Sequence, residues 1–206
     1  MIYLKKGAMF GLDARIALVI FGALSVISGA ALYSAIQQAR VVQASTTLNE
    51  LSKAIEAYYI DTATPIPEYM PSSNVLNIGN LYNNFANVKG WNGPYFGSNS
   101  SNQAYLEFSL YGMNKAYYTR RYTKSDWGST LTTVNPKACT DTDCYIYLIY
   151  NTNHATDAGQ NLNNYFNNLD KEIDNSDGPG LGKVRAMILG VDFHIYYQVF
   201  PEYNRM

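Results

Sequence analysis

Acidic side chains cluster toward the C-terminal end, where Asp170, Glu172, Asp174 and Asp177 stand in the stretch LDKEIDNSDGPGLG. The simpler interpretation is a solvated loop that ends a helix and uses Asp as a turn former, and the chain then has no cofactor. The alternative is a Ca²⁺ site, because Ca²⁺ takes oxygen ligands that alternate along a loop with glycine at the sharp turn. We assign that alternative site to Asp170, Asp174 and Asp177.

Two cysteines, Cys139 and Cys144, stand with four residues between them. In an exported protein such a pair closes a small loop as a disulfide, which we predict here because of the membrane segment described below. The alternative is two free thiols. A structural metal site is disfavoured, because the chain has no further cysteine to complete a four-ligand set.

Signals of catalysis are few. His154 and His194 are isolated, and His194 alternates with apolar residues in a predicted strand. The sequence lacks a glycine-rich phosphate loop, a nucleophile elbow and a paired-histidine metal motif. We therefore predict that the protein is not an enzyme.

One short segment combines basic and aromatic residues: Tyr117, Tyr118, Arg120, Arg121, Tyr122 and Lys124. Such a patch could contact DNA. A strand with a charged edge is the simpler interpretation. The net charge of -1 and the pI near 6.1 indicate no general positive field, so nucleic acid is not an expected partner.

A lone acid, Asp13, precedes an uncharged run of 21 residues from Ile16 to Ile36. As a helix, this run would be roughly 30 Å long, which matches the hydrocarbon core of a bilayer. The flank before it carries Lys5, Lys6 and Arg15, so the positive-inside rule keeps the flank in the cytoplasm and exports the rest. We predict a single membrane span over about residues 14–36.

A carboxylate at this depth needs a partner, since its insertion costs of order 2.5–3.5 kcal/mol. If a short leader were removed, the new amino terminus of a neighbouring subunit could reach Asp13, whereas the amine of the same straight helix could not easily fold back onto it. The pair would then form only on assembly and would set the axial register between subunits.

The leader Lys5-Lys6-Gly7-Ala8-Met9-Phe10-Gly11-Leu12-Asp13 resembles the class III leader of type IV pilins and type II secretion pseudopilins. The resemblance implies that a prepilin peptidase cleaves after Gly or Ala and methylates the new amine, and that an acid stands fifth in the mature chain. Cleavage after Ala8 makes Met9 the first residue and Asp13 the fifth, whereas cleavage after Gly7 makes Asp13 the sixth. We predict cleavage after Ala8.

The sequence departs from that pattern in three places. Asp13 stands where the family usually has Glu, and Arg15 offers Asp13 an internal partner. Ala30 replaces the helix-softening proline of the family. A plain signal anchor or a cleavable secretory signal is the alternative, with small residues at 28–31 for a signal peptidase. The apolar run exceeds the usual core of such a signal, and its helix continues beyond it.

Two further segments resemble the same family. Trp91-Asn92-Gly93-Pro94-Tyr95 is by itself a packed turn, and it is similar to the Trp-x-Gly-Pro-Tyr stretch that follows the spine helix of pseudopilins. Acidic loops similar to residues 173–178 occur in minor pilin-like proteins. Major pseudopilins bind Ca²⁺ in a loop of the head, but the resemblance supplies no ligand set for this chain.

No Gly or Pro follows the apolar run until Pro65. Within this continuation, apolar residues recur at helical spacing and form one stripe: Leu48, Leu51, Ile55, Tyr58 and Tyr59. We therefore predict one helix over residues 9–60, roughly 75 Å long. It follows a leader of residues 1–8 and precedes a globular head of residues 61–206. The second half of the helix should pack its stripe on the head.

Five segments of the head are rich in Tyr, Ile, Phe and Val and predict strands: 105–111, 115–123, 145–150, 184–189 and 194–200. Helical spacing predicts a short helix over 78–88 and a longer one over 159–173, whose buried side carries Leu162, Phe166, Leu169 and Ile173. The predicted fold class is α+β, with a long N-terminal helix packed on an antiparallel sheet, as in the pilin fold.

The resemblance implies a structural subunit of a type IV pilus-like filament or a type II secretion pseudopilus. Its partners would be other copies, other pilin-like subunits, the prepilin peptidase, the assembly platform and the bacterial inner membrane, with the head in the periplasm or on an extracellular filament. The alternative function is a single-pass anchored head that binds or adheres as a monomer.

Overall fold

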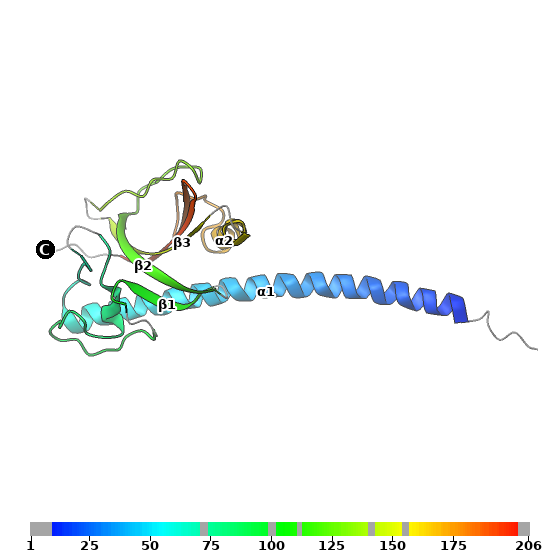
Figure 1. Ribbon diagram of the computed structural model, residues 1–206, viewed down its shortest axis with the longest axis horizontal. Helices are drawn as coiled ribbons and strands as arrows, with labels where there is room; N and C mark the ends of the chain where they lie inside the picture. Colours follow the sequence, from blue (N-terminus) through cyan, green and yellow to red (C-terminus); the bar gives the residue numbers. More distant parts are fainter. Residues whose placement is uncertain are drawn as a thin grey trace, which may run out of the picture. The chain divides into compact units, whose positions relative to one another are not determined.

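The computed structural model describes residues 10–70, 74–98, 102–110, 113–139, 143–153 and 157–201. They form, in order, α1 (Phe10–Thr62), the 3-10 helix η1 (Ile78–Leu81), β1 (Tyr105–Leu110), β2 (Met113–Thr123), β3 (Cys144–Asn153), α2 (Asp157–Asp174), β4 (Val184–Leu189) and β5 (Asp192–Pro201) (Figure 1). The chain divides into two compact units, Met1–Arg40 and Val41–Met206, and the division falls within α1.

In the first unit, the described residues are the N-terminal part of α1. Every described side chain from Asp13 to Ile36 is exposed. By length and composition, α1 is able to cross a membrane. The predicted long apolar helix near the N-terminus is therefore present, and it is compatible with a single membrane anchor.

Helix α1 ends at Thr62 for local reasons. The Thr62 hydroxyl donates to the Tyr58 carbonyl at 2.7 Å. Ala63 takes a left-handed conformation with φ 50° and donates its N–H to the Tyr59 carbonyl at 2.9 Å, as at many helix C-termini. Pro65 follows two residues later and cannot continue the helix. The predicted end near residue 60 is therefore correct to within two residues.

The second unit contains an antiparallel sheet with strand order β1-β2-β3-β5-β4. All five predicted strands are present, and β4 has the predicted bounds. Strand β3 continues to Asn153 and β5 begins at Asp192, because these two residues are paired with each other at the end of the β3–β5 ladder. The structure confirms the predicted long N-terminal helix and the antiparallel sheet that follows it in the chain.

One face of the sheet carries the main core, which also includes residues of both helices. From α1, Leu51, Ile55 and Tyr58 are fully buried, and Tyr59 stacks on Phe200 of β5 at a ring distance of 5.5 Å. From α2 and the strands, the same core includes Leu162, Phe166, Leu169, Tyr117, Leu148, Phe193, Ile195 and Tyr197. The second half of α1 thus packs its apolar stripe within the second compact unit, Val41–Met206, as predicted.

The helix predicted over residues 78–88 is wrong beyond its first turn. Only Ile78–Leu81 is helical, as a 3-10 turn. Beyond this turn, asparagine side chains accept hydrogen bonds from backbone N–H groups that would donate to backbone carbonyls in an α-helix. Asn80 Oδ1 accepts the Ala86 N–H at 3.0 Å, and Asn84 Oδ1 accepts the Val88 N–H at 2.7 Å. These local bonds compete with helix formation and explain the difference.

Candidate functional site

An exposed apolar surface covers the part of α1 that belongs to the first unit. Exposed large side chains on it are Ile16, Leu18, Val19, Ile20, Phe21, Leu24, Val26, Ile27, Leu32, Tyr33 and Ile36. At Gly22 and Gly29 an added Cβ would meet nothing within 4 Å, so another helix could approach the backbone closely there. A contiguous apolar surface of this extent marks contact with lipid or protein.

Asp13 lies in the first turn of α1, where the helix dipole favours a negative charge. Asp13 and Arg15 are both exposed. Residues two apart on a helix do not face each other, and no ion pair joins them among the described residues. The internal Asp13–Arg15 pair that the sequence suggested is therefore not formed. The predicted cleavage residues Gly7, Ala8 and Met9 lie outside the described part of the chain.

The turn at residues 90–95 contacts both η1 and the C-terminal end of α1. Trp91 donates its indole N–H to the Asn80 carbonyl at 2.6 Å, and the Tyr95 hydroxyl donates to Asp61 at 3.0 Å. Gly90 has φ 83°, and an added Cβ would lie 2.5 Å from the Asp61 carbonyl oxygen. Glycine is therefore required where this turn meets the helix end.

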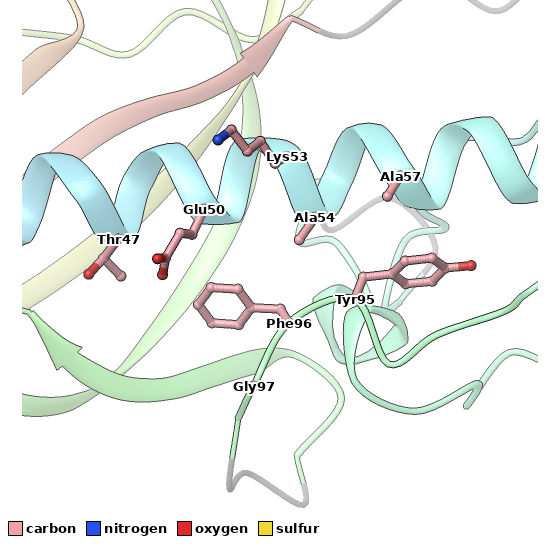
Figure 2. Close-up of a pocket in the computed structure, with 8 residues that line it drawn as sticks. All are labelled: Thr47, Glu50, Lys53, Ala54, Ala57, Tyr95, Phe96 and Gly97. Atoms are coloured by element: carbon pink, nitrogen blue, oxygen red, sulfur yellow. The ribbon is translucent and has the colours of Figure 1, made fainter.

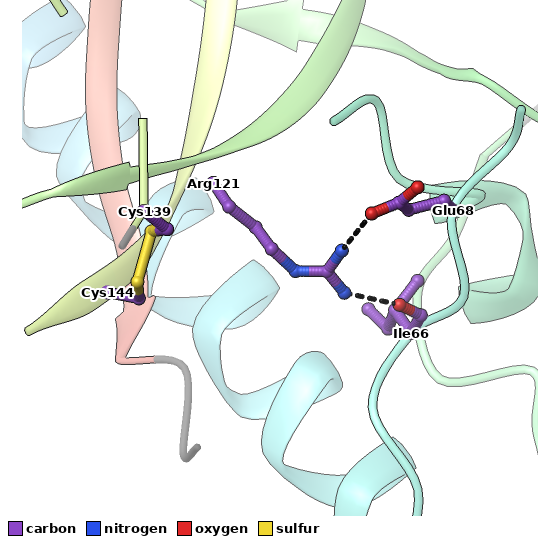
Figure 3. Close-up of polar contacts among 5 residues, drawn as sticks. All are labelled: Ile66, Glu68, Arg121, Cys139 and Cys144. Atoms are coloured by element: carbon purple, nitrogen blue, oxygen red, sulfur yellow. Dashed lines mark hydrogen bonds and ion pairs between the residues drawn. A yellow bond between two sulfur atoms is a disulfide. The ribbon is translucent and has the colours of Figure 1, made fainter. Parts of the chain in front are cut away.

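The basic and aromatic residues of β2 do not form one surface. Alternation along the strand turns Tyr117 toward the main core and Tyr122 toward the opposite face of the sheet. Arg121 is 9% exposed, donates to the Ile66 carbonyl at 2.8 Å and pairs with Glu68 at 3.4 Å (Figure 3). The patch considered for DNA is thus divided between two faces, and its most buried cation has a structural role.

The opposite face of the sheet carries a second, aromatic core: Tyr122, Trp127, Val134, Tyr147, Ile149, Met187 and Tyr196. Trp127 and Val134 come from the segment between β2 and β3, which therefore covers part of this face. His194 lies buried beside Tyr196, and burial lowers its pKa. This environment favours neutral His194 and fits its prediction as a sheet residue.

Cys139 and Cys144 form the predicted disulfide, with their Cα atoms 5.5 Å apart (Figure 3). Cys144 is the first residue of β3, and the neighbour of Cys139, Ala138, makes a β-bridge to Tyr122. The disulfide therefore holds the end of the segment between β2 and β3 against the sheet.

Replacing both cysteines with serine should lower the free energy of unfolding by about 2 kcal/mol, because the bridge restricts a short loop of the unfolded chain. Urea unfolding without reductant would measure the loss. Reductant should destabilise the wild type by a similar amount and leave the double variant unchanged. A wild type that is insensitive to reductant would contradict the prediction.

The structure brings the three predicted ligand residues Asp170, Asp174 and Asp177 together, with one carboxylate oxygen from each within 4.8 Å of the others. Asp170 is buried, Asp174 half-buried and Asp177 exposed. Burial raises the pKa of Asp170. Burial, together with repulsion by Asp174 and Asp170, raises the pKa of Asp177 to about 6.

Arg185 lies close enough to Asp174 and Asp177 to interact with them electrostatically, and the sequence analysis did not single it out. It is 1% exposed, and its guanidinium lies 4.3 Å from the centre of the Trp127 ring. It donates to the carbonyls of Gly182 at 3.0 Å, Ser125 at 2.8 Å and Lys124 at 2.8 Å. A charge inside an apolar strand, VRAMIL, was the only available signal.

An open groove of about 580 Å³ runs along α1 beside residues 95–97 (Figure 2). Its lining is Thr47, Glu50, Lys53, Ala54, Ala57, Tyr95, Phe96 and Gly97. Glu50 and Lys53 give the groove one acidic and one basic side chain beside apolar ones. It is a surface on which a segment of protein could rest.

Comparisons with protein-family models, with curated proteins and with solved structures found no match for this chain.

Proposed function

We propose that this chain is a structural subunit of a type IV pilus-like filament or of a type II secretion pseudopilus, assembled through α1 after its leader is removed. The observation that carries the proposal is the uncovered apolar part of α1. The same helix continues into a buried position in the head, where Leu51, Ile55 and Tyr58 are fully enclosed.

The exposed apolar side chains from Ile16 to Ile36 need a cover. Leaving them in water would forgo roughly 1.5–3 kcal/mol for each large aliphatic side chain. Lipid covers them while the subunit stands in the bacterial inner membrane as a single-pass protein. In the filament, the helices of other copies cover them instead.

Asp13 supports polymerisation over simple anchoring. It stands at the inner end of the apolar segment, and among the described residues it has no ion-pair partner. Cleavage after Ala8 would place a new amine at Met9, within reach of the Asp13 of a neighbouring subunit. A heterologous contact of this kind, repeated without closure, generates a filament.

The proposed topology follows from charge. The basic leader stays in the cytoplasm, where the prepilin peptidase and the assembly platform act, and the head lies in the periplasm or on the extracellular filament. The disulfide between Cys139 and Cys144 suits that oxidising location.

The second candidate is a single-pass anchored head that binds a partner and does not polymerise. The groove between α1 and residues 95–97 favours it, since Glu50 and Lys53 offer both signs of charge beside apolar side chains (Figure 2). In this case the leader would remain uncut or a signal peptidase would cleave further along.

Mass spectrometry of the protein extracted from membranes distinguishes the two functions. We expect a mature chain that begins at Met9 and carries one methyl group on its amine. A start at Ala8 with a methylated amine would keep the proposal and move the cleavage site. An intact Met1, or a start beyond Ser28, would contradict the filament function and support the anchored head.

A further inference from the structure

The hairpin between β4 and β5 ends in an apolar tip. Leu189 pairs with Asp192, so the connecting turn consists of Gly190 and Val191 alone. Gly190 has φ 62°, which glycine adopts without strain. Leu189 is 62% exposed and Val191 is 63% exposed. The fold of the second unit therefore leaves most of both side chains uncovered.

Val191 is an unusual residue for a two-residue hairpin turn. Such turns favour Asn, Asp and Gly, because these residues suit both the turn backbone and water. A β-branched side chain is better placed on the half-buried surface of a strand, and Val191 gains no such burial. Leu189 differs in the same way from Met187, which lies on the same face of β4 and is buried. A departure from local preference that adds nothing to the fold points to a contact outside the fold.

The tip lies at the end of the second unit where α1 enters it. At the opposite end, Tyr59 of α1 stacks on Phe200 of β5 at a ring distance of 5.5 Å. Figure 2 shows β5, in red, running in the same direction as α1. From the Phe200 contact back to Asp192, β5 covers about 26 Å. From Tyr59 back to Val41, the first residue of this unit, α1 covers about 27 Å. The hairpin turn is therefore at about the level of Val41.

The continuity of α1 holds this end of the second unit close to the bilayer in which the helix is proposed to stand. The uncharged run ends at Ile36, and α1 continues without a break to Val41. The helix rises only about 7.5 Å between these two residues, and tilt would lower that height further. The headgroup region on each side of a bilayer is roughly 5–8 Å thick. Val41 therefore stands at the headgroup layer, and so does the hairpin tip.

We propose that Leu189 and Val191 insert into the headgroup and upper acyl region of the bilayer that α1 spans. The segment from Ala186 to Val191 carries no charge, so hydrophobic contact, rather than attraction to anionic lipid, binds the tip. Together with α1, the tip gives the second unit two points of attachment and so fixes its orientation on the membrane surface. This inference rests on the membrane span of α1, which both functions proposed above share, and does not depend on polymerisation.

The test uses the full chain in phosphatidylcholine nanodiscs, with the fluorophore NBD attached to one added cysteine and with lipid spin-labelled near the headgroup as quencher. Leu189→Cys carries the probe at the tip, and Ile60→Cys is the matched control, 74% exposed at the C-terminal end of α1. Labelling without reductant keeps the disulfide between Cys139 and Cys144 intact. We expect the spin-labelled lipid to reduce fluorescence at least about twofold at position 189 and not at position 60, with no effect of added salt.

A charge at the tip should withdraw it from the lipid. Val191→Asp, combined with Leu189→Cys, should lower the quenching to the level of Ile60→Cys, because a carboxylate loses hydration in the bilayer. Val191→Ile in the same background should retain the quenching. Both changes fall at an exposed turn position and should keep the fold, which far-UV circular dichroism checks.

Ser25→Cys, in the middle of the uncharged run, reports separately on the span of α1 when the lipid is spin-labelled deep in the acyl chain. Quenching at position 25 without quenching at position 189 would overturn the inference and leave the span intact. No quenching at either position would contradict the span itself. Energy transfer between the labelled tips of two chains, without quenching by lipid, would also overturn the inference and assign the tip to a contact between copies.

Discussion

Asp13→Ala should remove the subunit from filaments while leaving it in the membrane. The substitution deletes the only acid near the inner end of the apolar segment. In the filament that we propose, the methylated amine of a neighbouring subunit would then have no counter-ion. Removing one partner of a desolvated ion pair costs about 3–5 kcal/mol, which corresponds to a loss of at least roughly two orders of magnitude in each assembly step. We expect incorporation into sheared filaments to fall below detection in an immunoblot.

Three controls accompany this measurement. Asp13→Glu should retain incorporation, because it keeps the charge, and Asp13→Asn should fail like Ala. Arg15→Ala should have a much smaller effect, because Arg15 is exposed and makes no ion pair with Asp13. The amount of Asp13→Ala protein in the membrane fraction should match the wild type. Normal incorporation of Asp13→Ala would refute the proposed assembly mechanism.

Arg185→Met should cause the largest loss of stability in the head. Methionine keeps an unbranched, largely apolar side chain but lacks the guanidinium. It therefore leaves the carbonyls of Lys124, Ser125 and Gly182 without their donor and removes the cation from the Trp127 ring. Hydrogen bonds from a charged donor contribute about 1.5–3 kcal/mol each, and the three lost here are part-buried, so we expect a loss of at least about 3 kcal/mol. Urea unfolding followed by tryptophan fluorescence would measure it.

Arg120→Met is the matched control for Arg185→Met. Arg120 stands on β2 of the same sheet, is half-exposed, and lies 5.4 Å from the Tyr118 ring without an ion pair among the described residues. Its replacement should cost less than about 1 kcal/mol. Arg185→Lys should recover only part of the loss, because an ammonium cannot reproduce the planar fork of a guanidinium. Equal stabilities of Arg185→Met and wild type would contradict the role of Arg185.

Local patterns in the sequence determined most of the secondary structure. The uncharged run and the stripe through Leu51, Ile55 and Tyr58 predicted α1, because helical periodicity is a property of neighbouring residues. The five strands followed from β-branched and aromatic enrichment in the same way. The short helix over 78–88 failed because asparagine side chains bind the local backbone, a competition that hydrophobic spacing does not register.

The pairing of distant segments was decided by the tertiary structure alone. Arg121 on β2 binds Glu68 and the Ile66 carbonyl, which are 53 and 55 residues away in the chain. Because side chains alternate along β2, the basic and aromatic residues of this strand are divided between the two faces of the sheet. The role of Arg185 depends on the carbonyls of Lys124 and Ser125, which belong to another segment. Such contacts arise from sheet register and loop closure, so no local pattern contains them.

The sequence by itself determined that Asp170, Asp174 and Asp177 could act together, and that Asp13 stands alone before an apolar run. Only the folded chain decided that the three carboxylates converge within 4.8 Å and that one of them is buried with an unpaired oxygen. The reason is that residue type and spacing define which groups are available, whereas burial and separation depend on how α2, the loop and β4 pack on one another.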